Sequence, residues 1–136
     1  MPLMQWTAKL SVGVAAIDAE HKQLVKLLNE LFDAMQDGQG RAVVGKTLAG
    51  LIIYTKTHFA NEERLLRQHG YPGLPTQMAE HDALTKQVID VQRKFDNDPK
   101  ALITVNVLNF LRDWLTNHIL GLDHEYMSFL NAKGVR

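Results

Sequence analysis

A histidine and a glutamate lie four residues apart in the stretch THFANEE, residues 57–63 of the chain. Residues four apart share one face of an α-helix, so the side chains of His58 and Glu62 can point at the same object. An imidazole nitrogen beside a carboxylate oxygen suits a first-row transition metal, whereas magnesium and calcium prefer oxygen ligands alone. One pair does not define a metal site, so the rest of the chain has to supply further ligands.

The composition limits what such a site can contain. The chain has 136 residues, the size of one ordinary domain with one hydrophobic core. It has no cysteine, which excludes disulfides, thiolate metal ligands and a cysteine nucleophile. Any metal must therefore be held by nitrogen and oxygen donors.

The charge pattern gives no basis for binding nucleic acid or an anionic membrane. Fifteen basic and fifteen acidic residues cancel, and the sequence has no dense basic patch. The N-terminal residues lack the features of a secretory signal, and no apolar stretch approaches the ~20 residues of a membrane span. We expect a soluble, cytoplasmic monomer.

Apolar residues recur at steps of three and four along most of the chain, which predicts four long amphipathic helices. We expect them at about residues 18–36, 41–68, 75–95 and 99–120, with an extended arm over 1–17 and a tail helix over 123–130. Asp18 is expected to cap the first helix, and Pro75 suits the first turn of the third. Short connections between sequential helices favour an all-α, antiparallel up-down-up-down four-helix bundle that forms a single domain over residues 1–136.

Each of the four predicted helices carries one histidine on its apolar face: His21, His58, His81 and His118. A single histidine of this kind is more often a hydrogen-bonded core residue than a ligand. Four that converge are different, because burying several imidazoles and a carboxylate without partners would cost on the order of several kcal/mol. In an antiparallel bundle all four also lie at the same height, since they fall early in the first and third helices and late in the second and fourth.

Asp123 follows His118 by five residues, which is not an ideal spacing for one face of a helix. Gly121 lies between them and is expected to loosen the helix, so that the carboxylate can turn back towards the histidines.

Taken together, these residues resemble those of the hemerythrins, in particular their single-domain bacterial form. The resemblance rests on His21, the His-x-x-x-Glu of His58 and Glu62, and the His-x-x-x-x-Asp of His118 and Asp123. DAEH at residues 18–21 and DWL at residues 113–115 add to it, and it covers essentially the whole chain. It implies a non-haem di-iron centre that binds dioxygen reversibly.

The resemblance also implies roles for individual residues. Glu62 and Asp123 match the carboxylates that bridge both irons beside an oxo or hydroxo group. The apolar oxygen pocket of the family corresponds to Leu24, Leu115 and Ile119. Such a lining excludes the water and protons that would release peroxide.

The resemblance implies different ligand sets for the two irons. His21 and His58 match the ligands of the iron that keeps an open position for oxygen, and His81 and His118 match ligands of the second iron. The family has a further histidine four residues before His81, where this chain has Gln77. Three outcomes stay open: the Gln77 amide oxygen binds the iron, a water or other ligand takes the place, or the iron is lost or under-occupied.

Several functions are compatible with this site. The leading one is an oxygen-binding protein, rather than an enzyme, that carries, stores or delivers dioxygen to an oxygen-consuming enzyme or interacts with a reductant. The vacancy at Gln77 could instead support peroxidase or oxidase turnover. A third alternative is a module that senses oxygen or iron.

Overall fold

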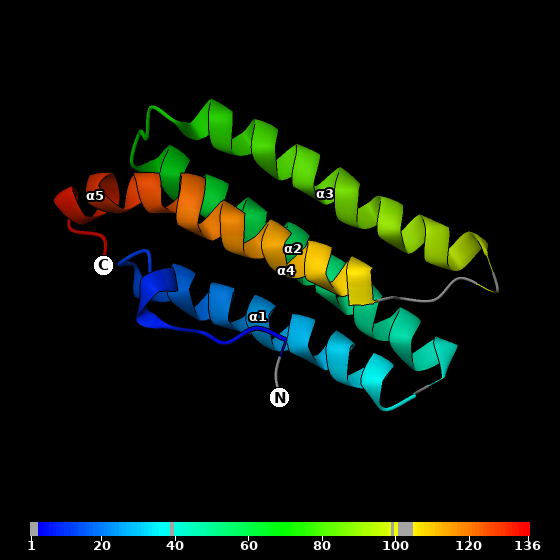
Figure 1. The fold of residues 1–136 in the computed structure, drawn as a ribbon. Coiled ribbons are helices and arrows are strands. Elements are labelled where there is room, and N and C mark those ends of the chain that lie inside the picture. Colours follow the sequence, from blue (N-terminus) through cyan, green and yellow to red (C-terminus); the bar gives the residue numbers. More distant parts are fainter. Residues whose placement is uncertain (1–2, 39, 99, 101–104) are drawn as a thin grey trace.

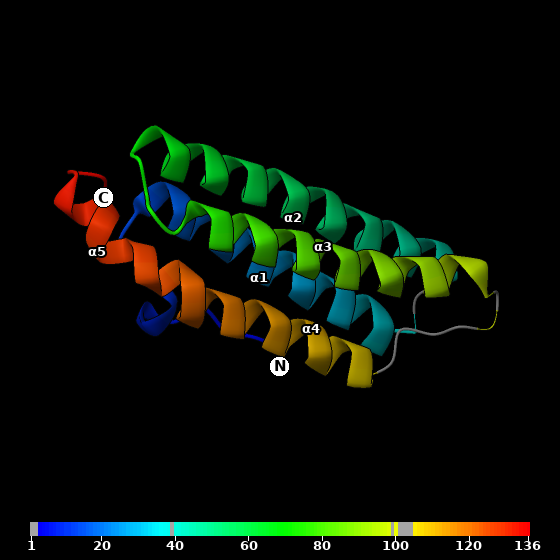
Figure 2. The ribbon, with the colours of Figure 1, turned by 90° about the horizontal axis from the view of Figure 1, so that it is seen from above.

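The computed structural model describes residues 3–38, 40–98, 100 and 105–136. Within these residues four long helices lie side by side, α1 (Ala15–Gln36), α2 (Arg41–Gln68), α3 (Leu74–Asn97) and α4 (Val105–His118). Each runs antiparallel to the helix before it, and each packs against its two neighbours in the order α1, α2, α3, α4 around the bundle (Figures 1 and 2). The expected all-α, up-down-up-down bundle is confirmed.

The first helix begins earlier than expected, because Asp18 does not cap it. Helix α1 starts at Ala15, with Val14 at the N-cap position. The Asp18 carboxylate instead accepts hydrogen bonds from the Val12 amide at 2.8 Å and from the Ser11 hydroxyl at 2.5 Å. Asp18 therefore fixes the loop that enters the helix, which allows the helix to start one turn before it.

The expected extended arm over residues 1–17 is only partly right. Its described part includes a 3₁₀-helix, η1 (Ala8–Leu10), and its last residues belong to α1. Met4 exchanges two backbone hydrogen bonds with the Asn29 side chain, at 2.9 and 2.8 Å, which hold the arm against α1. At the other end of the arm, the Asn131 amide donates to the Gly13 carbonyl at 3.0 Å.

Helix boundaries elsewhere follow the turn residues of the sequence. Helix α2 has the expected bounds, and α3 starts one residue early and runs two residues longer than expected, with Pro75 in its first turn. The expected start of the fourth helix at residue 99, and residues 101–104, lie outside the described residues. The tail helix α5 (His124–Ala132) begins one residue later than expected, because Asp123 ends a different segment.

That segment is a π-helix, η2 (Ile119–Asp123), which joins α4 to α5. The fourth helix was expected to run to residue 120, but it is α-helical only to His118. The chain continues without a break from α4 through η2 into α5, as Figure 1 shows. The widened turn therefore lies between His118 and Asp123, two of the residues expected in the metal site.

The interior of the bundle is apolar except at one level. Leucine, isoleucine, valine and phenylalanine side chains from the four helices, the arm and α5 form one buried cluster. The buried polar side chains are His21, Thr55, His58, Glu62, Gln77, His81, His118 and Asp123. No helix in the described part of the chain is long and apolar enough to cross a membrane.

Candidate metal centre

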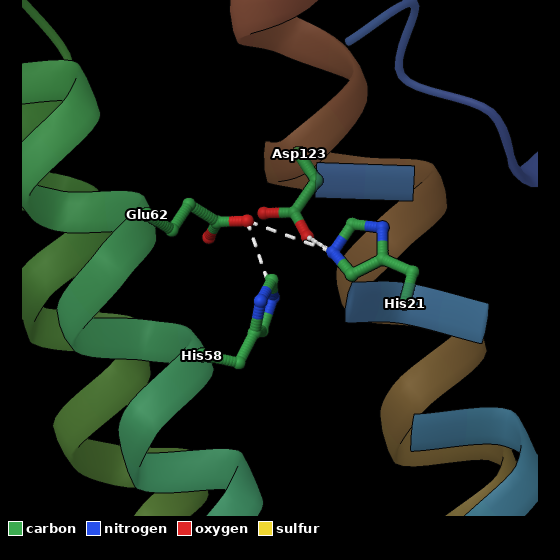
Figure 3. Close-up of side chains that lie close together, drawn as sticks. All are labelled: His21, His58, Glu62 and Asp123. Atoms are coloured by element: carbon green, nitrogen blue, oxygen red, sulfur yellow. Dashed lines mark ion pairs between the residues drawn. The ribbon is translucent and has the colours of Figure 1, made fainter. Parts of the chain in front are cut away.

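The six residues expected as metal ligands come together inside the bundle. They arise from all four long helices and from η2, and each is at most 3% exposed: His21, His58, Glu62, His81, His118 and Asp123. Figure 3 shows four of them, with His21 and Asp123 facing His58 and Glu62 across the interior. Antiparallel packing brings these distant sequence positions to one level of the bundle.

These residues form two groups of possible donor atoms that share both carboxylates. The first comprises His21, His58, Glu62 and Asp123, and the second comprises His81, His118, Glu62 and Asp123. Within each group the donor atoms lie within 4.8 Å of one another. Each group therefore offers two imidazole nitrogens and two carboxylate oxygens.

Glu62 presents a different oxygen to each group. Its Oε2 lies 3.6 Å from Nε2 of His21 and 3.3 Å from Nε2 of His58. Its Oε1 lies 2.9 Å from Nε2 of His81 and 4.0 Å from Nε2 of His118. A carboxylate in this orientation can bridge two cations, one through each oxygen.

Asp123 has the same arrangement on the opposite side. Its Oδ2 lies 3.1 Å from Nε2 of His21, and its Oδ1 lies 3.1 Å from Nε2 of His118. Two carboxylates thus span the space between the two pairs of histidines. The geometry is that of a dinuclear site.

The hydrogen-bonding state of these atoms tests whether a metal fits. Nε2 of all four histidines, Oε1 of Glu62 and Oδ2 of Asp123 are buried and make no hydrogen bond among the described residues, although they face one another at ion-pair distances such as 2.9 Å between His81 and Glu62. Leaving a buried polar atom unpaired costs about 1–3 kcal/mol, so such a concentration is unusual for a packed core. A cation in each group would be coordinated by these atoms, and nitrogen and oxygen donors in this mixture suit iron. The residues fit two metal ions.

The π-helix explains how Asp123 reaches the site. In a regular α-helix, a residue five positions after His118 would be rotated about 140° away from it. A π-helix hydrogen-bonds five residues apart, so the wider turn brings residues five apart onto one face. Gly121 lies inside this segment, and it is not among the glycines with positive φ.

Three carboxylates outside the two groups orient three of the four histidines. Nδ1 of His58 lies 2.7 Å from Oε1 of Glu20, and Nδ1 of His81 lies 2.7 Å from Oε2 of Glu63. A hydrogen bond at Nδ1 fixes the ring so that Nε2 faces the metal position, and it makes that nitrogen a stronger ligand. His118 has the same kind of partner, Glu80, at 3.2 Å.

Each of these three carboxylates lies next to a site residue in the sequence but pairs with a histidine on the following helix. Glu20 on α1 pairs with His58 on α2, Glu63 on α2 with His81 on α3, and Glu80 with His118 on α4. Glu20 and Glu80 were not among the residues expected in the site. Both lie directly beside an expected ligand, but so does Asp82, so this position alone does not distinguish them from other acidic residues.

Tyr126 was also missed, although it follows Asp123 by three residues and so shares its side of the helix. Its ring is fully buried, and its hydroxyl donates a hydrogen bond to Oε2 of Glu62 at 2.8 Å. Burial, together with the nearby Asp123 and Glu62 carboxylates, raises the pKa of Tyr126 well above its ordinary value. The hydroxyl therefore stays protonated and available as a donor.

The site histidines and carboxylates shift one another's pKa values so that each favours its charged form. Burial lowers the pKa of His21, but the adjacent Asp123 and Glu62 carboxylates outweigh burial and raise it to about 9. His118 behaves in the same way, with a pKa of about 9. Burial raises the pKa of Glu62, but the surrounding histidines lower it well below its ordinary value. Protons thus offset the carboxylate charge, and a bound cation would displace them.

Gln77 lies within the site, one helical turn before His81, and is 1% exposed. Its Nε2 donates to Oδ1 of Asp123 at 3.3 Å, and its Oε1 has no partner among the described residues. The residues expected to line the oxygen pocket are buried as well: Leu24, Leu115 and Ile119. Each lies within three residues of a site histidine, and their role in binding oxygen stays a prediction.

Comparison with known proteins agrees with this geometry. The family model described as the hemerythrin HHE cation binding domain matches residues 12–130. A bacteriohemerythrin of Methylococcus capsulatus is 37% identical, and the match covers 97% of this chain and all of the relative. A bacteriohemerythrin of Stenotrophomonas maltophilia is 33% identical over 97% of this chain and 84% of its own length.

Solved structures give the same result. A crystal structure of wild-type hemerythrin has a TM-score of 0.86 and 36% identity, covering 93% of this chain and 96% of the other. A leucine-to-alanine variant of hemerythrin has a TM-score of 0.87 at the same identity, covering 94% and 97%. Since family model, relatives and structures all span most of the chain, the protein belongs to the hemerythrin family of non-haem di-iron, oxygen-binding proteins.

Proposed function

We propose that this protein binds dioxygen reversibly at a di-iron centre and serves to carry, store or deliver oxygen. The observation that carries the proposal is the pair of donor groups that share Glu62 and Asp123. We assign His21 and His58 to one iron and His81 and His118 to the other, with both carboxylates and an oxo or hydroxo group as bridges. Membership of the family supports this assignment.

The residues around the centre have separate tasks. When bound, the two irons would supply the electrons that reversible oxygen binding requires. Leu24, Leu115 and Ile119 are proposed to form the apolar lining that keeps water and protons away from the bound oxygen. The carboxylates behind three of the histidines hold the imidazoles in place.

Iron content and the optical spectrum together test the proposal. We expect two irons per chain and charge-transfer bands in the oxidised protein. After the protein is reduced, we expect a new absorption band that appears on exposure to air and disappears under vacuum. Asp123→Asn keeps the size of the side chain but removes the charge of a proposed bridging carboxylate. We expect this variant to bind fewer than two irons per chain. A colourless wild-type protein without iron would exclude this function.

A peroxidase or oxidase activity is the second candidate, and Gln77 is the observation that favours it. Gln77 stands where the resemblance to the family implies a histidine, so the second iron would have one imidazole fewer. An oxygen ligand in place of imidazole makes the donor set of that iron harder, and harder donors favour the ferric state. We therefore expect the oxygenated band to decay faster than in Gln77→His, and steady consumption of peroxide with a reductant would favour the enzyme.

We also propose that residues 1–136 form one domain that works as a monomer. Sedimentation of the iron-loaded protein tests this, because a dimer would sediment at twice the mass of 15.4 kDa.

A further inference from the structure

The two donor groups are equal in what the protein supplies. Each has two histidine Nε2 atoms and one oxygen from each of the shared carboxylates, Glu62 and Asp123. The two groups therefore leave the same number of coordination positions open: as many on a metal held by His81 and His118 as on a metal held by His21 and His58. Among the described residues, the buried amide of Gln77 lies beside the second group and is the further donor that could remove this equality.

The position of the Gln77 amide argues against its being a ligand. Its nitrogen, not its oxygen, points at Oδ1 of Asp123, the oxygen that faces His118. Exchanging the two ends of the amide would place two acceptor oxygens 3.3 Å apart, because an ionised carboxylate can only accept hydrogen bonds. The amide is thus anchored to a carboxylate of the site through its N–H group.

The other end of the amide lacks a partner. Oε1 of Gln77 is buried without a hydrogen bond among the described residues, and an unpaired buried carbonyl costs about 1–3 kcal/mol. A small ligand that carries a hydrogen, such as water, would pair with this oxygen. The second N–H of the same amide could instead donate to a small anion.

We propose that the protein has a second position for a small exogenous ligand, located between Gln77 and the metal bound by His81 and His118. The ligand class is a small oxygen or nitrogen donor, with water at rest and anions able to replace it. Gln77 is then a positioning residue, which orients Asp123 and forms hydrogen bonds to the ligand. This inference rests on the proposed di-iron centre.

Counting azide ions bound to the fully oxidised protein tests the proposal. Isothermal titration calorimetry gives the number per chain, and the azide charge-transfer band follows the same titration. We expect two azides in the wild type, one in Gln77→His, whose added imidazole fills the second position, and two in Gln77→Leu. The titration is repeated with fluoride, a smaller anion, to check that the number of bound anions is not limited by the size of azide.

The variants separate the proposal from its alternative. If the Gln77 amide oxygen binds the metal, the wild type binds one azide and Gln77→Leu binds two, which overturns the proposal. One azide in both the wild type and Gln77→Leu also overturns it.

Iron is measured in every sample, and circular dichroism confirms that each variant is folded. Two irons with a single azide in the wild type refute the second position but leave the di-iron centre standing. Fewer than two irons in the wild type overturn both.

Discussion

The glutamates behind the site histidines show how single residues can hold a metal centre without touching the metal. Glu63 is partly exposed, yet its Oε2 lies 2.7 Å from Nδ1 of buried His81. Removing such a partner typically weakens metal binding about 10–100-fold, because the ring loses its fixed orientation and some of its basicity.

We therefore predict that Glu63→Gln lowers the affinity for iron by about 10–100-fold while the fold is retained. The amide has the size of the carboxylate but no charge, so it is a weaker acceptor for Nδ1–H. Competition with a chelator measures the affinity. Glu30→Gln is the control, since Glu30 is exposed and lies nine residues after His21 on the same helix. Equal affinity in both variants would contradict a positioning role for Glu63.

At this scale the sequence indicated which residues come together but not what surrounds them. The inward histidines and His58 with Glu62 could be selected from helical spacing, because their type is out of place on an apolar face. Glu20 and Glu80 could not, since acidic residues on the outer side of a helix usually remain in water. Their pairing depends on which helix lies alongside, and that information is in the packing.

At the scale of elements, the π-helical turn η2 is the feature that periodicity could not predict. Hydrophobic spacing assumes a regular helix, and a single widened turn shifts the facing of everything after it by one residue. The bounds of α2 were predictable because glycines precede it, at Gly38 and Gly40, and because Gly70 and Pro72 follow it. The start of α1 was not, because Asp18 binds loop amides instead of capping the helix.

The wide turn leads to a prediction about the length of this segment. Deleting Leu120, which is 45% exposed, would leave Asp123 four positions after His118 in a regular α-helix. That spacing keeps both side chains on one face, as for His58 and Glu62. We expect the deletion variant to retain two irons. Inserting an alanine after Leu120 would instead rotate the carboxylate by about 100°, and we expect iron to be lost.

Iron quantitation on both length variants decides between these outcomes, with circular dichroism to confirm that each is folded. Loss of iron from the deletion as well as the insertion would mean that the site requires the π turn itself, rather than only the facing of Asp123.

At the scale of the whole molecule, the last residues of the N-terminal arm meet α5 at one end of the bundle (Figure 1). The Asn131 side chain donates to the carbonyls of Gly13 and Val135, at 3.0 and 2.8 Å. Gly13 has φ +70, and a Cβ there would lie 3.0 Å from Oδ1 of Asn131 and 3.1 Å from the sulfur of Met127. Where the arm meets α5, a larger residue at position 13 would therefore have a strained backbone and would displace Asn131 and Met127.

We predict that Gly13→Ala destabilises the fold by about 1–3 kcal/mol through its backbone conformation, plus the cost of displacing Asn131 and Met127. Gly38→Ala is a matched control, because Gly38 has φ +65 but nothing within 4 Å of its Cβ position. Denaturant unfolding of both variants separates the contact from the conformational effect. If the two variants lost equal stability, the contact between the arm and α5 would contribute nothing.

The buried polar site also ties the stability of the whole bundle to its metal. Four histidines and two carboxylates are buried at the site, and together they come from all four long helices and η2. Several of their atoms make no hydrogen bond among the described residues. A cation bound only by the folded chain stabilises it by about 2.7 kcal/mol when its concentration is 100 times the dissociation constant. For a chain of this size, that gain corresponds to a rise in Tm of about 10 °C.

We therefore expect removal of iron by a chelator to lower the Tm by about this amount, and return of iron to restore it. The same measurement on Asp123→Asn shows whether the change in Tm comes from the metal site or from the chelator itself. Its weakened centre should show a much smaller difference in Tm between iron-loaded and iron-free samples. Because the ligands lie on all four helices, hydrogen exchange should slow in each of them when iron binds. Protection confined to α2 would mean that the metal is held by His58 and Glu62 alone, without the bridging arrangement that joins the helices.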